Sequence, residues 1–113
     1  MATEKPSQNV LDEIIRRIVA VACPERIILF GSAARGKMDR NSDIDLLVIK
    51  RGTYNPRHVA AEIYMKLYGV GQAVDLIIMT PEQIEQYRNS PYIVVYPALR
   101  EGKVVYDAGK VPA

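Results

Sequence analysis

Two short apolar runs, each bounded by a polar turn, most constrain how this chain can fold. The first run, Ile27–Phe30, ends at Gly31-Ser32. The second run, Leu46–Ile49, begins directly after Asp43-Ile44-Asp45. Short apolar runs bounded by turn residues predict buried β-strands. Because the second run is apolar on both faces, we expect it in the centre of a sheet.

The two aspartates at the start of the second run predict a cation site. Alternate residues of a strand point to the same face, so Asp43 and Asp45 share a face and Ile44 points into the core. Two carboxylates held this close repel each other unless a cation lies between them. Mg²⁺ takes oxygen ligands of this kind and bridges them to substrate phosphates. The pattern therefore predicts a metal-dependent site for nucleotidyl transfer.

A third carboxylate, Asp75, lies inside the apolar run of residues 73–78. A carboxylate in such a run is costly unless it is paired or binds a metal. If its strand lies beside the strand of Asp45, the three aspartates can hold two Mg²⁺ ions. One ion would activate the attacking hydroxyl, and the other would bind the nucleotide phosphates. In this arrangement Asp75 is the predicted general base.

The Gly31-Ser32 pair has the features of a phosphate-binding turn. Glycine lets the backbone approach a phosphate closely, and a strand-to-helix turn presents free N–H groups. The Ser32 hydroxyl is expected to donate to a phosphate oxygen. Candidates for further phosphate contacts follow in the chain: Arg35, Lys37 and Arg40. The turn is not a Walker P-loop, because the Gly-x4-Gly-Lys-Ser/Thr pattern is absent.

Each of these features alone also has an ordinary structural interpretation. Gly31-Ser32 is more often a tight turn, Asp43 an N-cap, and Asp75 half of a buried ion pair. Arg35 is more often a solvated surface residue. The occurrence of all the features at the spacing of one site favours the catalytic interpretation.

The remaining pattern predicts an α/β (α+β) fold, a small mixed β-sheet with helices packed on it. Helices are expected over residues 9–22, 33–36, 55–68 and 81–88, and strands over residues 26–30, 43–50, 72–79 and 103–106. Asn9 is the predicted N-cap of the first helix, and Asn55 and Thr80 those of two later helices. Tyr64 belongs to the predicted inward stripe of its helix. Residues 90–100 fit either a helix or a strand.

Length and composition limit the class of protein. The 113 residues predict one domain over 1–113, with a frayed tail from about residue 107. The net charge of +2 is too balanced for a nucleic-acid-binding surface. Cys23 is the single cysteine, which fits a reducing compartment. No apolar run reaches the ~18 residues of a membrane span, and residues 1–9 lack the apolar core of a signal peptide. We therefore expect a cytoplasmic protein.

The string Gly31-Ser32-Ala33-Ala34-Arg35-Gly36, followed by Ser42 to Val48, resembles the minimal nucleotidyltransferase branch of the DNA polymerase β-like nucleotidyltransferase superfamily. The resemblance runs from the first helix to about Tyr106. It implies the nucleotidyltransferase fold, with ATP as the donor. It assigns Asp43, Asp45 and Asp75 as catalytic residues and metal ligands. It assigns Gly31, Ser32 and Arg35 as nucleotide-binding residues.

Members of this branch are often antitoxins paired with HEPN-domain toxins. The resemblance thus implies transfer of AMP from ATP to a tyrosine of a HEPN-domain partner. One alternative is a non-catalytic antitoxin that neutralises its partner by occlusion, and another is catalysis on a small molecule or an RNA end. The three intact aspartates favour transfer to a protein. The short chain and its balanced charge disfavour small molecules and RNA. Homo- and hetero-oligomers both remain open.

Overall fold

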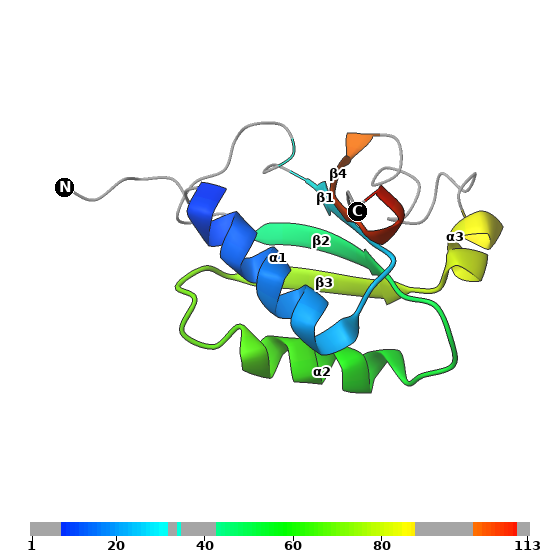
Figure 1. The fold of residues 1–113 in the computed structure, drawn as a ribbon, viewed down its shortest axis with the longest axis horizontal. Helices are drawn as coiled ribbons and strands as arrows, with labels where there is room; N and C mark the ends of the chain where they lie inside the picture. Colours follow the sequence, from blue (N-terminus) through cyan, green and yellow to red (C-terminus); the bar gives the residue numbers. More distant parts are fainter. Residues whose placement is uncertain (1–7, 32–33, 35–42, 88–100, 111–113) are drawn as a thin grey trace.

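The structure is a computed structural model of the 113-residue chain that describes residues 8–31, 34, 43–87 and 101–110. Its elements in chain order are α1 (Gln8–Ala22), β1 (Arg26–Phe30), β2 (Ile44–Ile49), α2 (Pro56–Lys66), β3 (Val74–Met79), α3 (Pro81–Tyr87), β4 (Lys103–Asp107) and the 3-10 helix η1 (Ala108–Lys110) (Figure 1). Of the helix predicted over 33–36, only Ala34 is described, and it lies in a turn. Residues 90–100, for which the sequence fits either a helix or a strand, lie outside the described residues.

The four strands form one mixed sheet in the order β3-β2-β1-β4. β1 is antiparallel to both β2 and β4, whereas β2 and β3 are parallel. Parallel neighbours need a long crossover connection, and α2 supplies it between β2 and β3. β2 is therefore an inner strand, which confirms the prediction from its apolar run.

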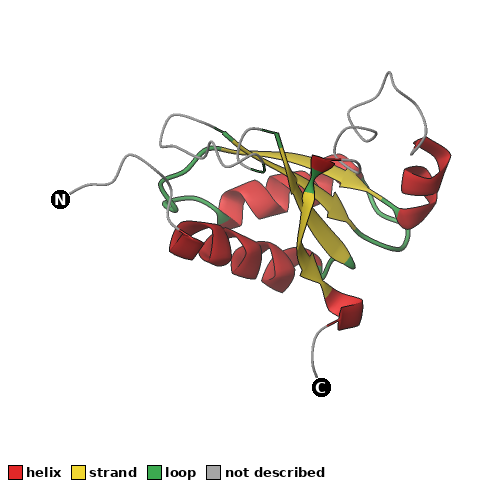
Figure 2. Ribbon diagram, turned by 90° about the horizontal axis from the view of Figure 1, so that it is seen from above, coloured by secondary structure: helices red, strands yellow, loops and turns green. Residues whose placement is uncertain are grey.

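Helices α1 and α2 cover one face of this sheet and enclose the main core (Figures 1 and 2). The fully buried side chains of this core include Ile14 and Ile18 of α1 and Ile63 of α2. From the sheet, Ile27 and Leu46 point into the same core. No helix among the described residues has the length and apolarity needed to cross a membrane.

The opposite face of the sheet has a smaller apolar cluster that leads to the site. Its buried members, Ile28, Leu47 and Ile49, alternate along β1 and β2 with residues of the main core. Ile84 of α3 packs against this cluster. Because side chains alternate between faces, Asp45 of β2 shares this second face with Leu47.

The sequence predicted two helix caps correctly and one incorrectly. The Asn55 side chain accepts hydrogen bonds from the N–H groups of Arg57 and His58, at 3.0 and 3.4 Å. Thr80 and Gln83 form a reciprocal capping box, with bonds of 2.9 and 3.0 Å. Asn9 is not a cap, because α1 already includes Gln8. Glutamine is a good helix former, so the helix continues beyond the apolar stripe on which the prediction rested.

Regular structure extends past residue 107, where the sequence predicts that a tail begins: Asp107 ends β4 and residues 108–110 form η1. Asp107 pairs with Arg26 in the β1–β4 register and lies 3.4 Å from its guanidinium. The N–H of Ala108 donates to the carbonyl of Glu25 at 2.9 Å. These contacts tie the end of β4 to the start of β1, a long-range effect that the local sequence does not show.

Candidate active site

The sheet brings the three predicted aspartates to one end of its second face. Asp45, the second residue of β2, pairs in register with Phe30 of β1 on one side and with Asp75 of β3 on the other. In a parallel ladder such partners point to the same face, so Asp45 and Asp75 are neighbours. Asp43 directly precedes β2. All three lie where β2 and β3 begin and β1 ends.

The carboxylates of this cluster interact with one another. The pKa of Asp75 is raised by partial desolvation, then by a hydrogen bond with the Asp43 carboxylate and by its charge. The pKa of Asp45 is also raised, first by burial and then by the charges of Asp75 and Asp43. Neighbouring carboxylates that disfavour each other's ionisation in this way indicate a site where the binding of a cation would be favourable.

The three carboxylates are chemically suited to a hard divalent cation, but their side chains are not placed around a common point for one. Among residues 8–31, 34, 43–87 and 101–110, no group of three or more His, Cys, Asp or Glu side chains stands in position to hold a metal ion. Carboxylate oxygens are the ligands that Mg²⁺ prefers. The pKa values of Asp45 and Asp75 are raised in part by the neighbouring carboxylates, so a bound cation would offset this mutual repulsion.

Gly31 fits against the cluster because it has no side chain. Its φ of +75° is left-handed, and a Cβ built on it would collide with Oδ2 of Asp45 and lie 3.2 Å from Cγ. The N–H of Ala34 donates to the carbonyl of Gly31 at 3.2 Å, which closes the turn. Both backbone conformation and space therefore require glycine here. Ser32 and Arg35, the other predicted nucleotide-binding residues, lie outside the described residues, as do Lys37 and Arg40.

Replacing Gly31 with alanine should damage the site more than the fold. Gly69 is a matched control, because its φ is +84° and a Cβ there would meet nothing within 4 Å. Both substitutions should cost roughly 1–2 kcal/mol of stability, since alanine is strained in the left-handed region. Only Gly31→Ala should displace Asp45 and lose nucleotidyl transfer. Thermal unfolding and transfer assays on both variants test this, and full activity in Gly31→Ala would contradict the packing argument.

The prediction that Tyr64 points inward is wrong. Its side chain is 44% exposed, and its hydroxyl accepts a hydrogen bond of 3.0 Å from the N–H of Leu76. β3 is an edge strand, so its outward N–H groups have no strand partner. Tyr64 thus secures the strand edge one residue from Asp75. Helical periodicity contains no signal for this role, which depends on α2 lying beside the sheet edge.

Comparisons with solved structures give the same fold. A crystal structure of a candidate nucleotidyltransferase from Sulfolobus solfataricus superposes with a TM-score of 0.63 at 19% identity, covering 93% of this chain and 84% of that one. A toxin–antitoxin crystal structure with AMP-PNP superposes with a TM-score of 0.56 at 22% identity, covering 90% of this chain and 74% of that one. At these identities the likeness concerns the fold alone.

Sequence comparisons identify the family. Residues 12–110 match the model of the family described as polymerase beta, nucleotidyltransferase. A candidate protein adenylyltransferase of Methanocaldococcus jannaschii is 31% identical over 116 residues, which cover 92% of this chain and 74% of the relative. The chain therefore belongs to the polymerase beta nucleotidyltransferase family and is a transferase enzyme.

Proposed function

We propose that this chain transfers AMP from ATP to a hydroxyl group of a partner protein, with Mg²⁺ as cofactor. The observation that carries the proposal is the meeting of Asp43, Asp45 and Asp75 beside Gly31 on the second face of the sheet. The relative from Methanocaldococcus jannaschii, a candidate protein adenylyltransferase, supports a protein as the acceptor. We also propose that residues 1–113 act as one domain and work in the cytoplasm.

In this reaction the acceptor oxygen attacks the α-phosphorus of ATP, and the bond to the pyrophosphate leaving group breaks. Asp75 takes the proton of the attacking hydroxyl, because it lies across the ladder from Asp45 at the open edge of the sheet. Asp43 and Asp45, assisted by Asp75, would hold two Mg²⁺ ions. Bound Mg²⁺ would lower the pKa of the acceptor hydroxyl and offset the charge on the leaving group. Gly31 leaves room for the Asp45 carboxylate and for a phosphate close to the backbone.

The Ser32→Ala variant tests the nucleotide-binding role of the turn. A hydrogen bond to a charged group contributes about 1.5–3 kcal/mol, so kcat/KM for ATP should fall roughly ten- to a hundredfold. The Arg35→Ala variant examines the other predicted phosphate contact in the same assay. An unchanged kcat/KM in Ser32→Ala would remove that residue from the site.

We further propose that the partner is a HEPN-domain toxin and that this chain is its antitoxin. The likeness to a toxin–antitoxin structure with AMP-PNP is consistent with such a pair. The alternative is an antitoxin that only occludes its partner. The three carboxylates at one point favour catalysis, because occlusion gives no reason to gather mutually repelling charges.

The direct experiment incubates a purified HEPN-domain protein, the partner of the proposed pair, with ATP and catalytic amounts of the chain. Intact-mass spectrometry should show the partner gaining the mass of an adenylyl group in Mg²⁺ and not in EDTA. A partner that is neutralised only at equal molar amounts, with no gain in mass, would support occlusion instead. A partner that is neither modified nor neutralised would contradict both versions.

A further inference from the structure

The last turn of α2 and the turn that follows it expose three large apolar side chains together. Tyr64, Met65 and Tyr68 are 44%, 78% and 89% exposed, and they line an open hollow of about 520 Å³. We call these three residues the α2 patch. Single exposed apolar residues are ordinary, but a contiguous group of this kind is typical of an interaction site. Aromatic residues and methionine are also the types enriched where proteins bind one another.

The α2 patch lies beside the edge of the sheet that holds the candidate site. The hydroxyl of Tyr64 accepts the N–H of Leu76, the residue that follows Asp75. Figure 1 shows α2 running alongside β3, with the end of α2 level with the beginning of β3. A molecule bound to the α2 patch would therefore lie at the exposed edge of β3, one residue along the strand from Asp75, whose side chain is on the other face of the sheet.

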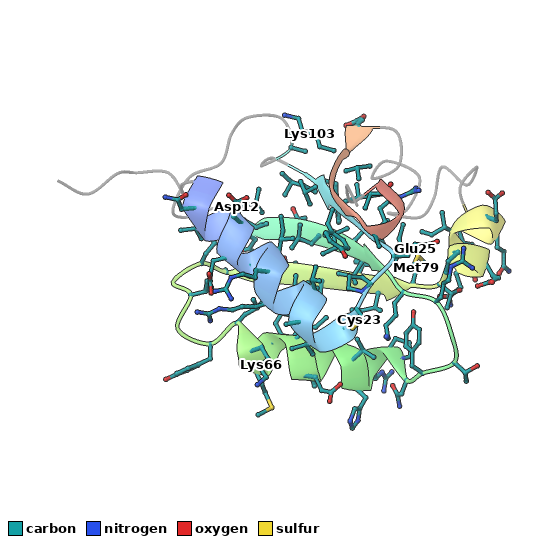
Figure 3. All side chains as sticks on the ribbon, viewed as in Figure 1. Asp12, Cys23, Glu25, Lys66, Met79 and Lys103 are labelled. Atoms are coloured by element: carbon teal, nitrogen blue, oxygen red, sulfur yellow. The ribbon has the colours of Figure 1, made fainter. Side chains whose placement is uncertain are left out.

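The surface next to the α2 patch is basic. A hollow of about 320 Å³ is lined by Arg16, Arg17 and Lys66, while Glu13 is the carboxylate that binds both arginines. Arg17 also donates to the carbonyls of Lys66 and Tyr68, at 3.0 and 3.3 Å, which fixes the end of α2. Lys66 itself points away from the sheet (Figure 3). Three cations and one carboxylate leave a net positive surface that complements an acidic ligand.

A protein fits this surface better than a nucleic acid does. Binding a phosphate backbone depends on several cations that are free to pair with phosphates. Here both arginines bind Glu13, and Arg17 holds backbone carbonyls as well. The apolar area of the α2 patch instead favours apolar side chains, with acidic residues alongside to face Lys66.

We propose that the α2 patch is the docking surface for the protein substrate, and that it binds an acidic segment with apolar side chains near the acceptor hydroxyl. This inference rests on the proposed function. A segment that docks there and passes round the edge of β3 would bring the hydroxyl to Asp75 on the second face, and would replace a bimolecular encounter with a local one. The α2 patch would then determine affinity for the acceptor protein, and not affinity for the nucleotide.

The test uses a double variant, Met65→Ser with Tyr68→Ser, and a single variant, Lys66→Glu. Val104→Ser is the matched control, because Val104 is 55% exposed on β4, at the opposite edge of the sheet from β3. The probe is the purified HEPN-domain protein of the proposed pair. Calorimetry gives its Kd, transfer kinetics give its KM, and a separate titration gives the Kd of Mg·ATP. Thermal unfolding checks the fold of each variant.

The double variant should bind the HEPN-domain protein roughly thirtyfold more weakly, with a matching rise in KM, as for the loss of an interface hot spot. Lys66→Glu should weaken binding in the same direction. Val104→Ser should match the wild type, and the Kd of Mg·ATP should stay the same in all variants. A double variant that binds the HEPN-domain protein like the wild type overturns the docking surface and leaves the proposed function in place.

The other outcomes separate this inference from the proposed function. If the wild type binds through the α2 patch but transfers no AMP, the docking surface stands and catalysis is wrong. If the wild type neither binds nor modifies the probe, both proposals fail. Sedimentation tests whether a second copy of the chain occupies the α2 patch, and a labelled oligo-dT strand tests whether a nucleic acid does. Self-association or oligonucleotide binding that the variants abolish, with unchanged binding of the HEPN-domain protein, overturns the inference in favour of a second copy or a nucleic acid.

Discussion

Replacing Asp43 or Asp45 with asparagine should abolish AMP transfer while the protein stays folded. Each substitution removes a charged oxygen ligand from the proposed metal site. A bound metal contributes several kcal/mol of transition-state stabilisation, so kcat should fall roughly a thousandfold or more. Radiolabelled transfer assays measure this. Glu62→Gln, which removes an exposed carboxylate from α2, is the control and should keep full activity. Normal transfer in both aspartate variants would contradict the metal-site assignment.

The Asp45→Asn variant should also be at least as stable as the wild type near neutral pH. The pKa of Asp45 is raised in the folded protein, so the folded state holds this proton at pH values where the unfolded state has released it. Stability is therefore lost as pH rises from about 4, the pKa of an unfolded Asp, through the higher folded pKa. Asparagine does not ionise and avoids this loss. Melting curves at pH 3 and pH 8 should show the difference between wild type and variant only at the higher pH.

Replacing Asp75 with asparagine should remove transfer and preserve binding of Mg·ATP. Loss of a general base typically lowers the rate by 10²–10⁴-fold, on the order of 3–5 kcal/mol in the barrier. Asparagine keeps the shape of the side chain and can still donate a hydrogen bond to Asp43. Titration calorimetry of Mg·ATP and single-turnover transfer on this variant test both parts of the prediction.

The same variant decides between the catalytic and the structural interpretation of Asp75. A structural partner in a buried ion pair would leave an unpaired charge when removed, and the Tm would fall. The structure places Asp75 at an exposed position beside two other carboxylates, so the Tm should stay level or rise. A clear fall in Tm with intact transfer would contradict the role as base.

The sequence predicts the central part of the fold because local patterns determine it. The apolar run Leu46–Ile49 identifies an inner strand, and the helix and strand predicted over 55–68 and 72–79 match α2 and β3 to within two residues at each end. The alternation Asp43-Ile44-Asp45 fixes which side chains share a face. The adjacency of Asp45 and Asp75 is different, because it depends on β3 pairing with β2. Spacing alone does not give that strand order, and the family resemblance supplied it.

The features that the sequence did not predict depend on contacts between distant segments. Tyr64 fits the apolar stripe of α2, but the position of α2 at the sheet edge turns its hydroxyl toward Leu76. Residues 107–110 look like a tail in the sequence, but Asp107 pairs with Arg26 and the N–H of Ala108 donates to the carbonyl of Glu25. The collision of a Cβ at Gly31 with Asp45 likewise requires the β1–β2 register. Local secondary-structure propensity carries no information about these contacts between distant segments.

The most direct test of nucleotidyl transfer compares two labels on ATP. The wild-type chain is incubated with the HEPN-domain protein and Mg²⁺, with ATP labelled on either the α- or the γ-phosphate. The proposed reaction predicts that the α-label becomes covalently attached to the partner and that the γ-label leaves with pyrophosphate. Attachment of the γ-label would indicate a kinase, and attachment of neither label would contradict transfer to this partner.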